Sequence, residues 1–193
     1  MHDIEPFYGW REKYIASEDE RSFFYGSASN EFTFTNKVYN YLIHPQWDSF
    51  GTDTLYLKIL FVDYDEHFAI IEFIGEWNDC INNDVMFLKR KIIDQLIQND
   101  IYKFILCFDN VLNFHSSDES YYEEWFDDIK EDNGYVCCLN LLEHVNVEMA
   151  KHNIHYYLNF GDNFDNINWR KIKPKNLVIQ VESILNSQIK SLH

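Results

Sequence analysis

Two adjacent serines, Ser116 and Ser117, are the first residues in this chain that could do chemistry, and they lie between His115 and Asp118. A serine hydroxyl beside a histidine base is the beginning of a nucleophilic site, but that site also needs a third group that orients the base. The sequence shows no identifiable orienting residue, so we expect no catalytic residue here. The structural alternative is a capping box, because Ser116 and Glu119 have the spacing of a helix N-cap and its third residue.

An acidic run continues along the helix that these serines would open. It consists of Glu119, Glu123, Glu124, Asp127, Asp128, Glu131 and Asp132. Such a run could bind a cation or a basic partner, and like charges four residues apart cost helix stability. The acids lie largely opposite an aromatic helix face, which predicts a solvated outer surface. A calcium loop would need alternating ligands and a glycine turn, and the run has neither.

Two other groups of residues have the types that bind ions. His144, Glu148 and His152 follow one another at four-residue spacing, which can place ligands on one side of a helix, but no HExxH motif is present. The basic segment 169–175 (WRKIKPK) could bind an anion, although pairing with the chain's own acids is the simpler expectation. We therefore expect no metal site and no cofactor.

The overall charge limits the class of partner. The 193 residues carry a net charge of -16, which disfavours binding to nucleic acid or to an anionic membrane and favours a basic protein partner. No apolar run is long enough to cross a membrane, and the first residues do not have the pattern of a signal peptide. The four cysteines form no C-x-x-C motif, which together with these features indicates a reducing, cytoplasmic location.

Buried-strand and amphipathic-helix patterns alternate from Phe68 to Phe160, which predicts an α/β fold with a mixed central sheet. The first two strands are joined so closely that they should form an antiparallel hairpin, with Gly75 ending the second. The predicted strands are 55–62, 68–74, 102–108, 135–140 and 156–160. The predicted helices are 84–99, one that starts at Ser116, one near 141–149, and 176–190.

The chain reads as a single domain over 1–193. It has an N-terminal arm and strand at 1–54, a core at 55–160, and a C-terminal loop and helix at 161–193. The aromatic residues of segment 1–30 are too many to leave in water, and 31–43 suggests a strand or a short hairpin. The apolar face of helix 84–99 is wider than one sheet contact needs, so the arm or a partner chain should cover the remainder.

The order of elements resembles the STAS domain, the fold of bacterial anti-sigma-factor antagonists, over residues 55–160. The segments IIEFIGEWN (70–78) and LKRKIIDQLIQNDIYKFILCFDNV (88–111) resemble its core, and NFHSSDES (113–120) lies where the family has an Asp-Ser-Ser-Gly motif. The resemblance implies that a partner kinase phosphorylates Ser116, at a helix start whose N–H groups favour phosphate. His115 and Asp118 replace the family's Asp and Gly. The whole chain also resembles a broader bacterial family with this arm, which implies no activity.

We therefore expect a cytoplasmic, non-enzymatic regulatory or protein-interaction module of STAS-like architecture. Its partner surface would combine His115, Ser116, Ser117 and Asp118 with Gly75, Glu76 and Trp77. The alternative is an enzyme or small-ligand-binding protein with a pocket lined by Tyr8, Trp10, Trp47 and Trp77. A third hypothesis is self-association in which the arm of one chain covers helix 84–99 of another.

Overall fold

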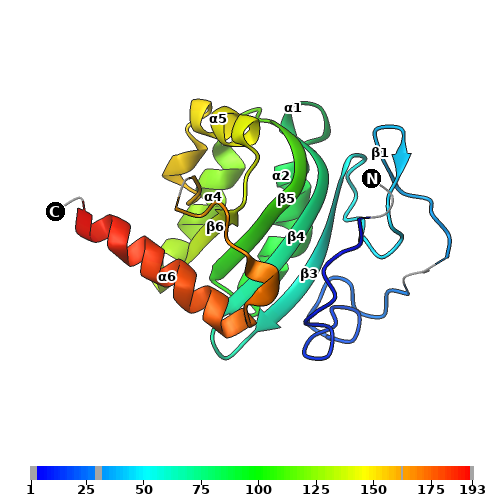
Figure 1. Ribbon diagram of the computed structural model, residues 1–193, viewed down its shortest axis with the longest axis horizontal. Coiled ribbons are helices and arrows are strands. Elements are labelled where there is room, and N and C mark those ends of the chain that lie inside the picture. Colours follow the sequence, from blue (N-terminus) through cyan, green and yellow to red (C-terminus); the bar gives the residue numbers. More distant parts are fainter. Residues whose placement is uncertain (1–3, 29–31, 162, 192–193) are drawn as a thin grey trace.

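The centre of the computed structural model, which describes residues 4–28, 32–161 and 163–191, is a four-stranded sheet in the order β3-β4-β5-β6 (Figure 1). The strands are β3 (Leu55–Asp63), β4 (Phe68–Asn78), β5 (Lys103–His115) and β6 (Tyr135–Leu139). β3 and β4 pair antiparallel, as predicted, whereas β4, β5 and β6 pair parallel. The predicted α/β fold with a mixed central sheet is confirmed.

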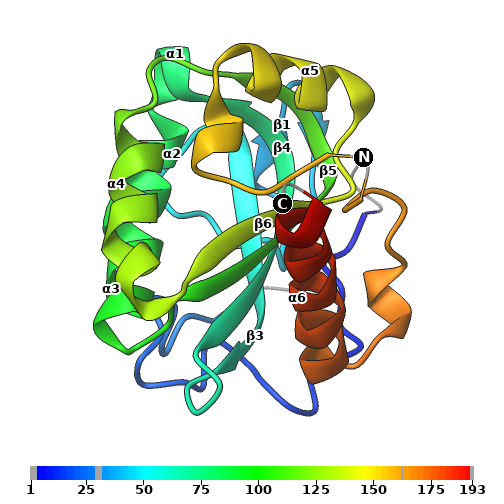
Figure 2. The ribbon, with the colours of Figure 1, turned by 90° about the vertical axis from the view of Figure 1, so that its left-hand side faces the viewer.

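Helices cover both faces of this sheet, with α2, α3 and α4 on one side and α6 on the other (Figure 2). Between β4 and β5 lie α1 (Asp79–Asn82), α2 (Asp84–Leu88), the π-helical segment η1 (Lys89–Ile93) and α3 (Asp94–Gln98). The helix α4 (Ser120–Ile129) and the 3-10 turn η2 (Lys130–Asp132) follow β5, and α5 (Glu143–Lys151) follows β6. The 3-10 turns η3 (Ile154–Tyr156) and η4 (Trp169–Lys171) precede α6 (Pro174–Ser191).

The strands are mostly apolar because alternate side chains point to opposite faces and both faces are largely buried. In β4, Ile71 and Phe73 pack toward α2 and α4, whereas Phe68 and Ile70 pack toward the C-terminal segment. None of the helices in the described part of the chain is both long and apolar enough to cross a membrane.

Both β4 and β5 run past the ends that the sequence predicts. Gly75 does not end β4 but lies inside it, where the register with β5 shifts. Its φ is +123°, and a Cβ there would lie 2.0 Å from the carbonyl oxygen of Thr54. The glycine therefore permits a close backbone approach to the loop before β3. The extended pairing continues to Asn78 and His115, so His115 ends a strand.

The second helix begins at Ser120 and not at Ser116, so the predicted capping box is wrong. Glu119 occupies the N-cap position and makes no side-chain capping bond. Asp118 takes over part of that role, because its Oδ1 accepts a hydrogen bond from the Ser120 backbone N–H at 3.0 Å. The cause is non-local: pairing with β4 holds the chain extended through His115, which moves the N-cap by three residues, from Ser116 to Glu119.

The predicted final strand, 156–160, is also wrong. Ile154 and Leu158 are buried on one side of a tight turn, and η3 occupies residues 154–156. Asn159 alone pairs with β6, donating its N–H to Val136 O and accepting from Cys138 N–H, both at 2.8 Å. This single bridge covers the outer edge of β6.

The N-terminal arm packs on its own chain, beside β3 (Figure 1). The Phe7 backbone N–H donates to Glu72 Oε2 at 2.8 Å, and Trp47 Nε1 donates to the Ile4 carbonyl at 2.9 Å. Gln95 Nε2 on α3 donates to the Arg21 carbonyl at 3.0 Å, and Phe24 belongs to the main core, so the arm reaches the side of the wide helix face. Residues 31–43 form a small hairpin of β1 (Lys37–Val38) and β2 (Tyr41–Leu42), apart from Glu31, which lies outside the described residues.

Candidate functional site

The carboxyl ends of β4 and β5 lie side by side because the two strands are parallel. Their last paired residues are Glu76 with Asn113, Trp77 with Phe114, and Asn78 with His115. Partners and ligands of α/β sheets commonly bind beyond the carboxyl ends of the strands. Figure 1 shows α1 and α5 at this end of the sheet, with the β1–β2 hairpin nearby. We use the name carboxyl-end surface for Tyr39, Glu76, Ile81, His115, Ser117 and Asp118.

The structure brings together two parts of the predicted partner surface that lie far apart in sequence. His115 Nε2 lies 3.1 Å from Glu76 Oε1, and Asn78 Nδ2 donates to the same oxygen at 3.2 Å. The His115 side chain is 47% exposed, whereas the Glu76 side chain is 14% exposed. This contact joins the carboxyl ends of β4 and β5 at the surface of the protein.

The two serines differ sharply in accessibility. Ser116 is only 6% exposed, and its Oγ has no hydrogen-bond partner among the described residues. Its carbonyl oxygen accepts from Cys80 Sγ at 2.8 Å, which ties α1 to this loop. Ser117 and Asp118 are exposed. No serine–histidine pair forms between Ser116 and His115 in the described structure, and Ser117 is the accessible hydroxyl.

Gly75 and Trp77 shape the surface from inside. Trp77 is fully buried, with its ring stacked on Phe108 at a centroid distance of 5.4 Å. Trp77 Nε1 donates to Asp79 Oδ1 at 3.1 Å. These two predicted site residues thus position β4 and α1 and do not offer side chains to a partner.

Two buried carboxylates, Asp79 and Asp84, flank α1. Asp79 is 1% exposed and accepts from Val85 N–H at 2.8 Å and Tyr122 OH at 2.6 Å, in addition to Trp77. Burial raises its pKa to about 6, against the opposing effect of these hydrogen bonds. Asp84 is 0% exposed and accepts from Asn78 N–H at 2.7 Å. Burial, assisted by neighbouring carboxylates, raises the pKa of Asp84 to about 7.

Sequence reasoning missed these two residues. The available signal was a pair of aspartates on either side of a short segment between a buried strand and a helix, a pattern typical of ordinary loops. Their burial depends on Tyr122, which comes from α4 more than 40 residues later in the chain, as the Tyr122–Asp79 separation of 43 shows.

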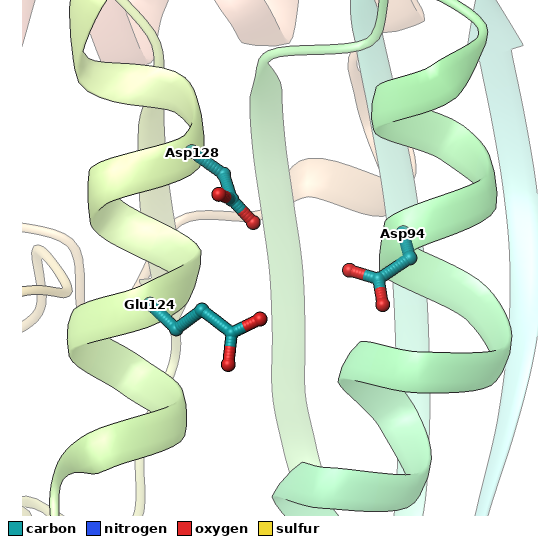
Figure 3. Close-up of side chains that lie close together, drawn as sticks. All are labelled: Asp94, Glu124 and Asp128. Carbon is teal, nitrogen blue, oxygen red and sulfur yellow. The ribbon is translucent and has the colours of Figure 1, made fainter.

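Asp94, Glu124 and Asp128 form a second acidic group, in which one carboxylate oxygen from each lies within 4.8 Å of the others. Figure 3 shows Glu124 and Asp128 pointing from α4 toward Asp94 on the facing helix. Lys89 is their counter-ion: its Nζ lies 2.7 Å from Asp128 Oδ2 and 3.5 Å from Glu124 Oε1, and it also contacts Asp94 Oδ1. The Lys89 side chain is 0% exposed. A metal ion would have to displace this ammonium group, so the cluster serves to join α3 and α4.

Other acids of the α4 run remain on the outside, as predicted. Glu119, Glu123, Asp127, Glu131 and Asp132 are exposed. The Lys130 ammonium lies 2.7 Å from Asp127 Oδ1. The predicted solvated face is therefore correct for these five residues and incomplete for Glu124 and Asp128, which are partly exposed but also face a second helix.

The basic segment pairs with the chain's own acids, as expected from the sequence. Arg170 contacts Glu72 Oε1 at 2.7 Å and Asp109 Oδ1 at 2.8 Å. Glu72 is 1% exposed at the centre of the sheet, and burial raises its pKa although Arg170 and the Phe7 N–H oppose the shift. Lys175 contacts Asp63 at 3.1 Å.

The four aromatic residues predicted to line a pocket lie in different places. Trp10 packs with Phe7 and Trp169, Trp47 belongs to a small cluster near the β1–β2 hairpin, and Trp77 lies in the main core. Tyr8 lines a hollow between the arm and β3, with a volume of about 60 Å³. Small-molecule sites usually have roughly 300–1,000 Å³.

Comparison with known proteins finds similarity at the level of structure. No protein-family model matches the chain, and no curated protein matches it. The anti-sigma factor antagonist SpoIIAA in its unphosphorylated form is similar at a TM-score of 0.48 and 14% identity, covering 66% of this chain and 96% of that chain. The phosphorylated form of SpoIIAA from Bacillus has a TM-score of 0.43 at 14% identity, with coverages of 65% and 98%.

A further similar structure is a putative anti-sigma factor antagonist from Thermotoga maritima. Its TM-score is 0.43 at 13% identity, and the alignment covers 65% of this chain and 92% of that chain.

Proposed function

We propose that this chain is a regulatory protein-interaction module that binds a partner protein through the carboxyl-end surface. The observation that carries the proposal is the exposure of Ile81, whose side chain is 78% exposed. Ile81 follows Cys80, which contacts the Ser116 carbonyl, so α1 and Ile81 lie beside the loop that carries the exposed Ser117 and Asp118. Exposed large apolar side chains with a polar rim mark interaction sites.

The β1–β2 hairpin adds a second exposed aromatic group to this surface. Tyr39 is 47% exposed, and its hydroxyl accepts a hydrogen bond from Asn113 Nδ2 at 2.6 Å. Asn113 pairs with Glu76 across the sheet, so the tyrosine lies beside the Glu76–His115 pair. Tyrosine is enriched at protein interfaces because it combines a large apolar ring with a polar hydroxyl.

The charge of the molecule favours a basic partner. The net charge is -16, and the carboxyl-end surface contributes Glu76 and Asp118 to it. Electrostatic complementarity speeds encounter with a positively charged surface and opposes encounter with an acidic one. The four cysteines are free thiols, which fits the proposed cytoplasmic location.

A phosphate on this surface would control the interaction. Sequence resemblance places the modified residue at Ser116, whereas the accessible hydroxyl is that of Ser117. Either phosphate would bring about two negative charges next to Asp118 and close to the apolar Ile81. The cost of desolvating that charge beside the apolar Ile81 would weaken the contact by more than the added attraction to a basic partner would strengthen it.

The test compares Ile81→Ser with Ile179→Ser, a matched control on α6 whose side chain is 64% exposed. Partners captured with the wild-type chain and identified by mass spectrometry should bind Ile81→Ser at least about tenfold more weakly and Ile179→Ser as tightly as the wild type. Ser117→Asp should weaken binding without changing the melting temperature. Equal binding by wild type, Ile81→Ser and Ser117→Asp would exclude this surface.

A small-ligand site is the alternative, and the hollow between the arm and β3 is the observation in its favour. It is lined by Tyr8, Tyr14 and Lys58 among others. Its volume of about 60 Å³ suits a ligand of a few atoms. Native mass spectrometry after incubation with small molecules from a lysate would show a discrete added mass, and a bare mass would count against this alternative.

A further inference from the structure

The short helix α1 lies between two buried carboxylates at the site proposed above. Asp79 is its first residue, and Asp84 begins α2 directly after Asn83. Asn83 has a left-handed backbone with φ of 54°, so the chain changes direction between the two helices. A helix of four residues is too short to be stable alone. The contacts at its two ends therefore decide whether α1 stays in place.

The contacts of Asp84 are incomplete for a charged group. Its Oδ2 accepts from Asn78 N–H, but its Oδ1 is buried and has no hydrogen-bond partner among the described residues. A buried carboxylate that lacks donors is costly when ionised. A proton on Asp84 removes that charge.

The charged neighbours of Asp84 make ionisation harder still. Asp79 on α1, Glu76 on β4 and Asp53 in the loop before β3 all raise its pKa. His115 on β5 pairs with Glu76, its Nε2 lying 3.1 Å from Glu76 Oε1.

The remaining titratable groups of this region face Asp79. Tyr122 on α4 donates its hydroxyl to Asp79 Oδ2, and Asp118 in the loop before α4 raises the pKa of Asp79. Ionisation of both aspartates would place two negative charges at the two ends of α1.

The same helix contacts the buried serine. Cys80 of α1 donates through Sγ to the Ser116 carbonyl, and Ser116 is 6% exposed. In Figure 2 the loop that leaves β5 toward α4 passes beside α1. A shift of α1 would therefore release the backbone of Ser116.

We propose that α1 is a proton-controlled cover over Ser116, closed while Asp84 is protonated and loosened when Asp79 and Asp84 are both ionised. Its regulatory meaning rests on the proposed function, since Ser116 matters as a switch only if this surface binds a partner. The opening of α1 itself is a property of the chain alone and can be measured without a partner.

The experiment is hydrogen–deuterium exchange of the full chain at about pH 5.5 and about pH 8, corrected for the intrinsic exchange rate. Because burial raises the pKa of Asp84 above its unfolded value, protonation favours the closed state, and this advantage disappears as the pH rises through about 7. Protection of amides 79–85 and of Ser116 should fall by about thirtyfold between the two pH values. The protection of the backbone amides of residues 105–107 in β5 should change much less between the two pH values.

Asp84→Asn is the decisive variant, because an amide keeps the acceptor for Asn78 N–H and cannot titrate. Its protection over 79–85 should fall only by the few-fold that ionisation of Asp79 contributes, whereas Asp65→Asn, an exposed aspartate in the turn between β3 and β4, should behave as the wild type. An equal pH response in Asp84→Asn and wild type would overturn the proposal. If Asp84→Asn does not fold, a wild type whose 79–85 protection is the same at both pH values would overturn it.

The two proposals fail separately. If captured partners bind Ile81→Ser as tightly as the wild type, the proposed function is excluded, but the hydrogen–deuterium exchange result is unaffected. Unchanged protection of α1 would remove the cover and leave the partner surface intact.

Discussion

Lys89 is the residue whose surroundings differ most from those of an ordinary helix lysine. Its side chain is fully buried, and its ammonium group is the cation for three carboxylates on two helices. The hydrogen bonds and charges of Asp94 and Asp128 raise its pKa although burial opposes the shift. Asp94, Glu124 and Asp128 are 26%, 38% and 43% exposed, so solvent weakens the attraction. The Arg90 guanidinium also contacts Asp94 Oδ2 at 3.3 Å and donates to Glu124 Oε2 at 2.7 Å, so Lys89 is the buried one of two cations that hold the cluster.

Replacement of that charge should be costly. Lys89→Met keeps the apolar stem but leaves three carboxylates close together without their ammonium group. We expect a loss of about 2 kcal/mol in the free energy of unfolding, less than for a fully buried pair because the acids are partly exposed. Urea unfolding of Lys89→Met and of the wild type measures this loss in the free energy of unfolding.

A cation should restore part of the loss in Lys89→Met, because the three carboxylates have the oxygen ligands that Ca²⁺ prefers. Millimolar Ca²⁺ should raise the melting temperature of the variant and leave that of the wild type unchanged. Lys130→Met is the control, since Lys130 pairs only at the surface, and its effect should be within about 0.5 kcal/mol. A Lys89→Met chain as stable as Lys130→Met would contradict this account of the cluster.

The sequence suggests some candidate site residues because their signal is local. Ser117 and Asp118 lie beside a predicted helix start, and both are exposed, whereas their role in binding a partner stays a prediction. Asp79 and Asp84 could not be found in this way, because their environment is made by Tyr122 and by the end of β4. Lys89 looked like an ordinary helix lysine for the same reason.

At the scale of elements, Gly75 shows how one residue lets β4 continue beyond its predicted end. Gly75→Ala would place a Cβ 2.0 Å from the Thr54 carbonyl oxygen on a backbone with φ of +123°. We expect a loss of about 3 kcal/mol, measured by urea unfolding.

Gly26→Ala separates backbone strain from steric overlap. Gly26 has φ of +71° and no atom within 4 Å of an added Cβ, so only the backbone preference of alanine should matter. Its cost should be about 1 kcal/mol. Equal losses in the two variants would show that the contact with Thr54 is unimportant.

Hydrophobic periodicity predicts the cores of the elements better than their ends. The aromatic face of α4 is confirmed in its buried residues Tyr122, Trp125 and Ile129. The ends of β4 and β5 depend on their mutual register, which is a non-local property. The helix predicted over 84–99 is interrupted by the π-helical turn η1, and a change of hydrogen-bond pattern by one residue leaves no mark in the apolar pattern.

At the scale of the whole molecule, the arm determines whether self-association is needed to cover the helix face. It makes its hydrogen bonds to Glu72 and Gln95 within one chain, and Phe24 joins the main core. Deletion of residues 1–28 should therefore lower the free energy of unfolding by at least about 3 kcal/mol.

The mass of the folded protein is the second measurement on that deletion. Native mass spectrometry should give the same oligomeric state for the shortened and full chains, because no neighbouring chain loses a contact. A full-length oligomer that becomes a monomer on deletion would show that the arm works between chains.

Glu72 accepts the Phe7 N–H and also contacts Arg170, and the rings of Trp10 and Trp169 lie 5.8 Å apart. Two segments about 160 residues apart in the sequence thus meet at one carboxylate of the central sheet. During synthesis, Phe7 and Trp10 leave the ribosome well before Trp169 and Arg170, because domains emerge from their N-terminal side. The rings of Phe7 and Trp10 therefore lack these partners until residue 170 has been made. In that interval they are exposed apolar surface, which makes the incomplete chain prone to aggregation.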